Sequence, residues 1–496
     1  MRSLAPADSL VYLETNDLAG ALQPLIDSKP FSEAAKDKPD FSALKGVQLA
    51  VTVTGFETSE EQVSEEQSIG RVQPRFVAIA DTHAWNFQAV GFAEKKLGSF
   101  VEKIYDSQPT LDKTDKNGGK YFTWTAADGR KAYALVIDSL IYFGNDESAI
   151  EKCLSVKRGE ADSIIKSGKV APADQQTLAS GYVSTDGIAQ IANIIGLKFA
   201  SEASEDSEVQ SAIAGILPQL LRNSITEISW TAAKTEQGIE DKYQITTSPL
   251  VAQVLSESIV SSETGSPTVE IFAPANAASV TRYDLKDLRI AWRSLLLTAQ
   301  RQTDALAGKI ISEFSNIFFE PYCIANPELF LESATSKIVT VRLDDEGEKL
   351  VVIAGIDDYA NMKKSISDEV DFSAPPLQMN GEEMWQSKDG TLAFARQMGF
   401  VLIGDPLNIK TCIDASENHF ENFSSFAKGR SPVITFANES ITTAAVMDVL
   451  SQRKSDNAKF VTRYSTETRF TKTGIERRTV SDFGLIGSII AQMAQD

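Results

Sequence analysis

One stretch decides the fold, and it begins with the turn Asp128-Gly129. It continues as a strand over Lys131 to Ile137, a strand over Leu140 to Gly144, and a helical run that reaches Cys153. An Asp-Gly pair favours the tight turn of a hairpin, because Gly readily takes a positive φ. Strands joined by such turns are antiparallel. The stretch therefore predicts antiparallel sheet followed by a covering helix.

The same order of features recurs downstream from Asp389-Gly390. The copy comprises Leu392 to Ala395, then Phe400 to Gly404, then Ile409 and Cys412. Three further pairs keep this order along the chain: Ala5 to Asp8 with Ala273 to Asn276, Phe76 to Ala80 with Leu350 to Ala354, and Thr235 to Glu240 with Thr471 to Glu476. We interpret the chain as a tandem duplication of two lobes.

The two lobes are predicted at residues 1–262 and 263–496. The segment Ser261 to Pro267, rich in Ser, Thr, Gly and Pro, is the predicted linker. Each lobe is predicted to be α+β, with a largely antiparallel sheet and helices over one face.

Several local expectations accompany this fold. The acidic segment Glu57 to Ser68 is interpreted as a solvated hairpin loop, and Ser201 to Glu208 as another acidic loop. Pro218 is expected to kink or end the helix that contains it. Asp112 to Gly119 is interpreted as a turn, because it lacks the closing Glu of a calcium loop.

Composition excludes several classes of partner. The chain of 496 residues carries 48 Lys and Arg against 68 Asp and Glu, a net charge of −20. Nucleic acids and anionic membranes bind clustered positive charge, so neither is an expected partner. No run approaches the roughly 18 apolar residues of a membrane span, so no membrane insertion is expected. The abrupt start of strand-like sequence after Met1 is consistent with a signal or anchor that has been removed.

The three cysteines do not form a disulfide framework. Their number is odd, and none belongs to a Cys-x-x-Cys pair. Cys153 and Cys412 occupy matching places in the repeat and are interpreted as small buried residues. A bridge between these two stays open at this level. Only two histidines are present, which disfavours zinc hydrolase chemistry.

No residue is assigned a catalytic, cofactor-binding or metal-binding role. His83 is interpreted as a surface or loop residue, and His419 as too isolated for a closed metal site. Glu382-Glu383 lacks the separation that glycosidases need, and Asp344 to Gly347 is interpreted as a turn. Gly144 and Gly404 each end a strand without a nucleotide-binding fingerprint. Trp124 and Trp385, each just before an Asp-Gly turn, are interpreted as packing residues.

The opening residues carry a resemblance to a family. Ala5-Pro6-Ala7-Asp8-Ser9-Leu10-Val11-Tyr12-Leu13 resembles a bacterial domain-of-unknown-function family that opens with Pro-Ala-Asp-Ser/Thr and an aromatic strand. The second lobe follows this pattern loosely, since Asn276-Ala277 replaces Asp8-Ser9. The resemblance implies a location outside the cytoplasmic membrane and brings no activity or site residue.

Together these observations favour a non-enzymatic extracytoplasmic bacterial protein that binds a ligand or belongs to the envelope. Its partner is expected to be a protein or an envelope component, met in a groove or on a broad surface between the lobes. Two alternatives stay open: a hydrolase with acidic residues in an inter-lobe cleft, and a structural subunit of a larger assembly. A cytoplasmic location is the alternative to an extracytoplasmic one.

Overall fold

The computed structural model describes residues 1–34, 38–62, 68–168, 170, 176–203, 207–262, 269–274, 276–344, 347–379, 381–417, 431–439, 446, 450 and 462–492. The chain forms two compact units, described separately below. The first unit comprises residues 1–243, 445–458 and 483–496, and the second comprises 244–444 and 459–482. The predicted boundary between residues 262 and 263 therefore falls inside the second unit.

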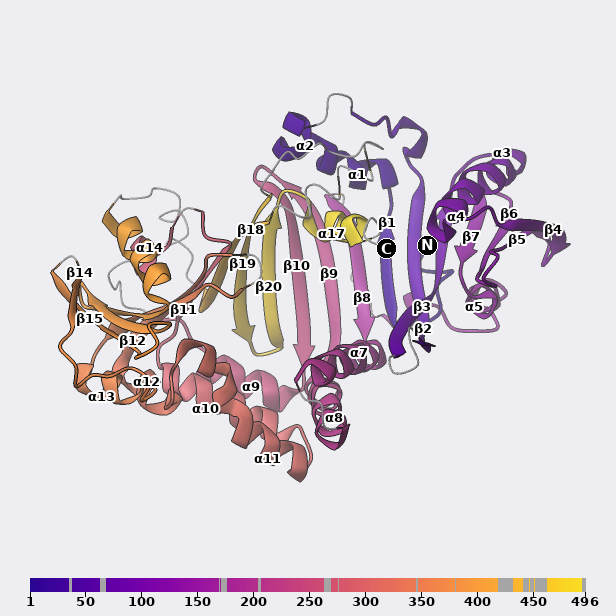
Figure 1. Cartoon of the computed structure of the whole chain (residues 1–496). Helices are drawn as coiled ribbons and strands as arrows, with labels where there is room; N and C mark the ends of the chain where they lie inside the picture. Colours follow the sequence, from indigo (N-terminus) through magenta and orange to yellow (C-terminus); the bar gives the residue numbers. More distant parts are fainter. Residues whose placement is uncertain are drawn as a thin grey trace. The chain divides into compact units, whose positions relative to one another are not determined.

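The first unit is built on antiparallel strands (Figure 1). The strands are β1 (Val11–Thr15), β2 (Gln48–Gln62), β3 (Ser68–Asp81), β4 (Thr110–Lys116), β5 (Gly119–Thr125), β6 (Lys131–Ile137), β7 (Leu140–Gly144), β8 (Thr177–Ser184), β9 (Ile225–Thr235) and β10 (Gly238–Thr247), whose last four residues belong to the second unit. Neighbours run β4-β5-β6-β7-β3-β2-β1-β8-β9-β10.

The helices of the first unit come from both ends of the chain. They are α1 (Leu18–Asp27), α2 (Lys29–Ala34), α3 (Asn86–Phe92), α4 (Gly98–Tyr105), α5 (Glu147–Lys157), α6 (Ile164–Ser167), α7 (Thr185–Ala203), α8 (Ser207–Ser224) and α17 (Gly484–Gln492). A short 3-10 turn covers Ser42–Leu44, and a π-helical turn, Ala93–Leu97, joins α3 to α4.

The second unit has its own series of antiparallel strands. They are β11 (Ser279–Asp284), β12 (Ala334–Arg342), β13 (Leu350–Ile356), β14 (Leu377–Met379), β15 (Glu382–Gln386), β16 (Ala393–Gln397), β17 (Phe400–Gly404), β18 (Val433–Glu439), β19 (Thr462–Thr471) and β20 (Gly474–Ser481). Neighbours run β14-β15-β16-β17-β13-β12-β11-β18-β19-β20. Taken in chain order, this is the same arrangement as in the first unit.

The helices of the second unit are α9 (Pro249–Ser258), α10 (Leu288–Arg301), α11 (Ala305–Phe314), α12 (Pro327–Ser333), α13 (Tyr359–Lys364) and α14 (Pro406–Glu417). Short 3-10 turns cover Val269–Phe272, Ser315–Phe318 and Glu320–Tyr322. The helix α9 belongs here because Val251 and Leu255 share a buried cluster with Leu285 and Phe330.

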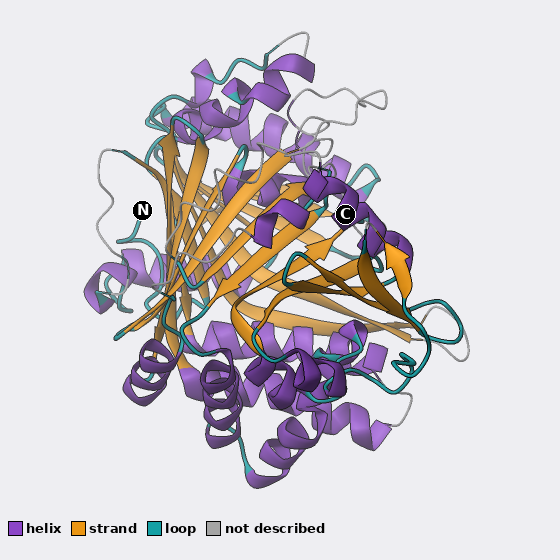
Figure 2. Ribbon diagram, turned by 90° about the vertical axis from the view of Figure 1, so that its left-hand side faces the viewer, coloured by secondary structure: helices purple, strands orange, loops and turns teal. Residues whose placement is uncertain are grey.

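Helices pack against both faces of the strands around β6, whereas the sequence predicted helices over one face; Figure 2 shows helices on either side of strands. In β6, Ala134 and Val136 pack with the segment that carries α3 and α4, while Leu135 packs with α5 on the opposite face. Successive residues of a strand alternate between faces, so two-sided burial requires a nearly continuous apolar run. Both units are therefore α+β, with antiparallel sheets packed against helices.

The two Asp-Gly turns form the predicted hairpins. Gly129 and Gly390 have φ values of 89° and 74°, and each follows an Asp whose carboxylate accepts a backbone N–H two residues later. The strand-ending glycines also have matching places. A Cβ on Gly144 would lie 2.2 Å from the carbonyl oxygen of Phe76, and one on Gly404 would lie 2.5 Å from that of Leu350. These two glycines allow close approach of backbones.

Three local predictions are wrong at least in part. Glu57 to Gln62 continues β2, because the ladder with β3 extends through this acidic segment as far as Gln62 and Ser68. Residues 201–203 and 207–208 belong to α7 and α8. Of the two outcomes expected at Pro218, an end of the helix is contradicted, since α8 continues to Ser224, and a kink stays a prediction. Most of the predicted linker, residues 263–267, lies outside the described residues.

Helices long and apolar enough to span a membrane are not found in the described part of the chain.

Candidate functional site

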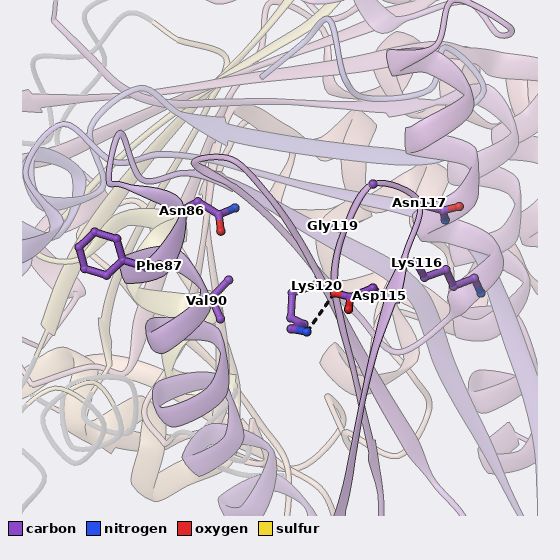
Figure 3. Close-up of a pocket in the computed structure, with 9 residues that line it drawn as sticks. Asn86, Phe87, Val90, Asp115, Lys116, Asn117, Gly119 and Lys120 are labelled. Carbon is purple, nitrogen blue, oxygen red and sulfur yellow. Dashed lines mark hydrogen bonds and ion pairs between the residues drawn. The ribbon is translucent and has the colours of Figure 1, made fainter.

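One concave feature of the first unit is an open trough of about 580 Å³ between α3 and the β4–β5 hairpin (Figure 3). Its lining comprises Asn86, Phe87 and Val90 of α3 and residues 115–120 of the hairpin. Pockets that hold small ligands commonly have a volume of this size, but they enclose the ligand far more completely. The open shape suits a segment of a larger partner.

The turn of the β4–β5 hairpin fixes the position of the hairpin beside the trough. Asn117 and Gly118 have φ values of 55° and 76°, the two positive angles that a tight two-residue hairpin turn requires. Lys116 forms an ion pair with Glu147 of α5, and the Asn117 amide donates to Glu151 at 3.2 Å. Both side chains point away from α3 (Figure 3). The turn is thus tied to α5, and its backbone stays beside the trough.

The charges that line the trough are paired. The Asp115 carboxylate lies 2.9 Å from Lys120 Nζ. The hydrogen bond from Lys116 lowers the pKa of Glu147, so this carboxylate is ionised at neutral pH. What the trough offers to a ligand is the Asn86 amide, paired charges, the Gly118–Gly119 backbone and the apolar Val90. Such groups suit a polypeptide segment better than a free anion or cation.

Two aromatic side chains stand exposed beside the trough. Trp85, at the cap position of α3, is 75% exposed, and Phe87 is 72% exposed. The Gln88 side chain accepts a hydrogen bond from the backbone N–H of Trp85 at 3.2 Å, which fixes the start of the helix. His83 lies close by on a turn, with its backbone N–H bonded to Asp81 and its ring 57% exposed. The interpretation of His83 as a surface residue is confirmed.

The cysteines are scaffold residues. Cys153 and Cys412 are fully buried free thiols in matching helices, and burial raises the pKa of each to about 12. Their interpretation as buried residues is confirmed. Cys323 is a half-buried free thiol, and burial raises its pKa to about 11. Thiols with pKa values this high carry almost no thiolate at neutral pH, so they are poor nucleophiles.

The remaining candidates do not converge on one site. Trp124 and Trp385 are buried in the cores of their own units. Glu382 and Glu383 are neighbours on β15, where successive positions alternate between faces. Asp344 accepts the backbone N–H groups of Gly347 and Lys349, as in a turn. His419 lies outside the described residues. Groups of three or more His, Cys, Asp or Glu placed to hold a metal ion are not found among the described residues.

Sequence reasoning missed most of the trough. It placed a turn at Asp112 to Gly119; the turn proper is Asn117-Gly118, and most of that segment is strand. It assigned no role to Trp85. The available signal was the pattern Trp85-Asn86-Phe87 at a helix start, but sequence alone does not show that these rings lie outside the core.

Comparison with known proteins adds little. Family models and curated proteins give no match to the chain. Two solved structures, described as crystal forms I and IV of TP0453, are 9% and 10% identical and cover 46% and 52% of this chain, and 98% and 84% of their own, each with a TM-score of 0.24. Similarity at this level supports no functional argument.

One buried carboxyl group in the first unit is strongly perturbed. Asp241 on β10 is 1% exposed, and it accepts hydrogen bonds from Trp230 Nε1 at 2.8 Å and from the Leu485 N–H at 2.9 Å. Burial raises its pKa to about 6 in spite of these donors. The carboxyl group meets the first turn of α17, so its role is to dock this helix.

We expect Asp241 to make the stability of the first unit depend on pH. Its folded pKa exceeds the unfolded value of about 3.9, so its protonated form favours folding below pH 4 and this contribution is lost as pH rises through 6. The loss amounts to about 3 kcal/mol. Relative to wild type, Asp241→Asn should gain stability by that amount between pH 4 and pH 7.5. Denaturant unfolding across this range measures the difference.

A suitable control is Glu236→Gln, on the exposed turn between β9 and β10. Its free energy of unfolding should depend on pH in the same way as that of the wild type. The same pH dependence for Asp241→Asn as well would show that the carboxyl group titrates at its ordinary value.

Proposed function

We propose that this protein is a non-enzymatic binding protein whose partner is a polypeptide of the bacterial cell envelope. The observation that carries the proposal is the exposure of Trp85 and Phe87 beside the trough. Aromatic side chains of this size usually bury most of their surface. At protein interfaces, Trp and other large anchors supply a disproportionate share of the binding free energy.

The trough complements these rings. A polypeptide whose apolar side chains pack on Trp85 and Phe87 would bring its backbone toward the Asn86 amide and the Gly118–Gly119 turn. Because Asp115 and Lys120 form an ion pair, their opposite charges would exert little net electrostatic force on the polypeptide. The proposal therefore places one contact surface within the first unit, in place of the inter-lobe groove expected from sequence.

We also propose that the two units arose by internal duplication. Support comes from the shared strand order, the matched Asp-Gly turns, and the matched places of Gly144 with Gly404 and of Cys153 with Cys412. The extracytoplasmic location proposed here rests on the resemblance of the opening residues to an extracytoplasmic bacterial family.

The proposed function is tested by capture with a Trp85→Ala/Phe87→Ala variant. Envelope and cytoplasmic extracts are passed over immobilised wild-type protein, and a captured partner is then purified and titrated by calorimetry. We expect the double variant to bind this partner at least about 30-fold more weakly, the loss of roughly 2 kcal/mol typical of an interface anchor.

The control is Leu407→Ala, since Leu407 is 74% exposed but lies on α14 of the second unit. It should bind as wild type does. Undiminished binding by the double variant would refute the Trp85–Phe87 surface, and a partner found only in the cytoplasmic extract would contradict the envelope location.

A further inference from the structure

The strand β4 is an open edge of the sheet in the first unit. It pairs with β5 from Thr110↔Thr125 to Lys116↔Gly119, and no other strand partner is found for it in the described part of the chain. All of its residues except the half-buried Leu111 are exposed. Figure 1 shows β4 projecting at the outer end of its strand series. Its outward N–H and C=O groups are available to a further strand.

Charges commonly protect such an edge against pairing with other chains. The charges of β4, however, have a particular order: Asp112-Lys113-Thr114-Asp115-Lys116. If two copies of β4 pair antiparallel about a two-fold axis at Thr114, Asp112 of each copy lies opposite Lys116 of the other, and Lys113 lies opposite Asp115. Each of these opposite-charge pairs therefore occurs twice in the dimer. A charge pattern that only repelled other strands would not need to complement itself.

We propose that β4 pairs with the β4 strand of a second copy of this chain, antiparallel and in register about Thr114. Opposite charges directly across an antiparallel pair are favourable, and like charges are unfavourable. Moving the two-fold axis to Asp115 would place two aspartates opposite each other, because only residues on one face of the strand can lie opposite each other. An axis at Lys113 would place two lysines opposite each other. Charge therefore favours the axis at Thr114 over these two.

The existing contacts are compatible with this pairing. Lys113 and Asp115 lie on the face that carries the partly buried Leu111, where Lys113 forms an ion pair with Glu94. Lys116 lies on the opposite face with Asp112 and forms its ion pair with Glu147. Both lysines are about half exposed, so each can approach a second carboxylate without leaving the first. Among the described residues, Asp112 has no ion-pair partner within the chain.

The corresponding edge strand of the second unit differs. It is β14, with only the three uncharged residues Leu377, Gln378 and Met379. The self-complementary pattern is thus particular to β4. Because the interface is small and each chain carries a net charge of −20, we expect a reversible dimer with a dissociation constant on the order of tens of micromolar.

The test is sedimentation velocity on wild type and on two charge reversals. Asp112→Lys places a lysine opposite Lys116 twice, and Lys116→Asp places an aspartate opposite Asp112 twice, so each variant should dimerise at least tenfold more weakly than wild type. Mixing the two variants restores both pairs. In the mixed dimer the introduced lysine of one chain faces the introduced aspartate of the other, and the unchanged Lys116 faces the unchanged Asp112. We expect the mixture to form heterodimers.

The matched control is Glu236→Lys, which makes the same change of charge as Asp112→Lys at the exposed β9–β10 turn. It should dimerise as wild type does. Weakened dimerisation of this control would show that net charge, and not the register of β4, governs association.

A second measurement does not depend on the variants. Hydrogen exchange of the wild-type β4 amides should slow as protein concentration rises, whereas that of the β9–β10 turn should not. A wild-type protein that stays monomeric well above the expected range would overturn the proposal. So would a dimer that neither charge reversal weakens, or β4 exchange that does not change with concentration.

Discussion

Replacing Glu14 with alanine should lower the free energy of unfolding of the first unit by about 3–5 kcal/mol, the range found when one partner of a buried ion pair is removed. Glu14 on β1 is 7% exposed. It forms an ion pair with Arg2, and it accepts hydrogen bonds from the Tyr12 hydroxyl at 2.8 Å and the Ser180 hydroxyl at 3.1 Å. Loss of the carboxylate leaves the Arg2 guanidinium without this ion-pair partner and the buried Tyr12 hydroxyl without this hydrogen-bond acceptor.

The measurement is chemical denaturation, with hydrogen exchange at β1 and β8 to assign the loss to the first unit. Asp8→Ala is a matched control, since Asp8 is a nearby carboxylate that is largely exposed and pairs with Lys152 on the surface. Exposed pairs contribute little, so this variant should unfold as wild type does. A loss below about 1 kcal/mol for Glu14→Ala would show that the network contributes little net stability.

Trp124→Ala should destabilise the first unit by about 3–5 kcal/mol, the cost of a large cavity in a packed core. Trp124 is 2% exposed, stacks on Phe122 with ring centroids 5.7 Å apart, and meets Phe143 edge-on at 6.4 Å. Calorimetry or denaturant unfolding measures the loss, and exchange at β5 to β7 locates it. Trp85→Ala removes an exposed indole and should change stability by less than about 0.5 kcal/mol.

Trp385→Ala provides the comparison in the second unit. Trp385 is buried at the matching place on β15, where its ring packs near that of Phe394. The Nζ atom of Lys363 lies over the Trp385 ring, 3.5 Å from the ring centroid. If the units are duplicates, its loss should fall in the same range and appear at β15 to β17. A large effect of Trp124→Ala with a negligible effect of Trp385→Ala would contradict equivalent structural roles for the two indoles.

The features that sequence predicted correctly depend on neighbouring residues. Asp128-Gly129 and Asp389-Gly390 each specify a tight turn, because a positive φ is inexpensive for Gly. Alternating or continuous apolar residues identified β6, β7, β16 and β17. The buried roles of Cys153 and Cys412 followed from their spacing on apolar helical faces.

The features that sequence predicted wrongly depend on distant partners. Glu57 to Gln62 has few apolar residues, yet it is a strand because β3 supplies a complete set of ladder partners. Helices on both faces of β6 could not be distinguished from helices on one face without knowing that α3 and α5 pack against opposite sides. The trough likewise exists only because α3 lies across from a hairpin that begins about twenty residues later.

Sequence alone determined the local elements of this protein, their order and the recurrence of that order, because turn geometry and hydrophobic periodicity act over a few residues. Tertiary structure decided which elements pack together. It assigned α17 to the first unit through Asp241, more than two hundred residues earlier, and it left Trp85, Phe87 and β4 at the surface. Burial and pairing are properties of the packed chain, and no local pattern encodes them.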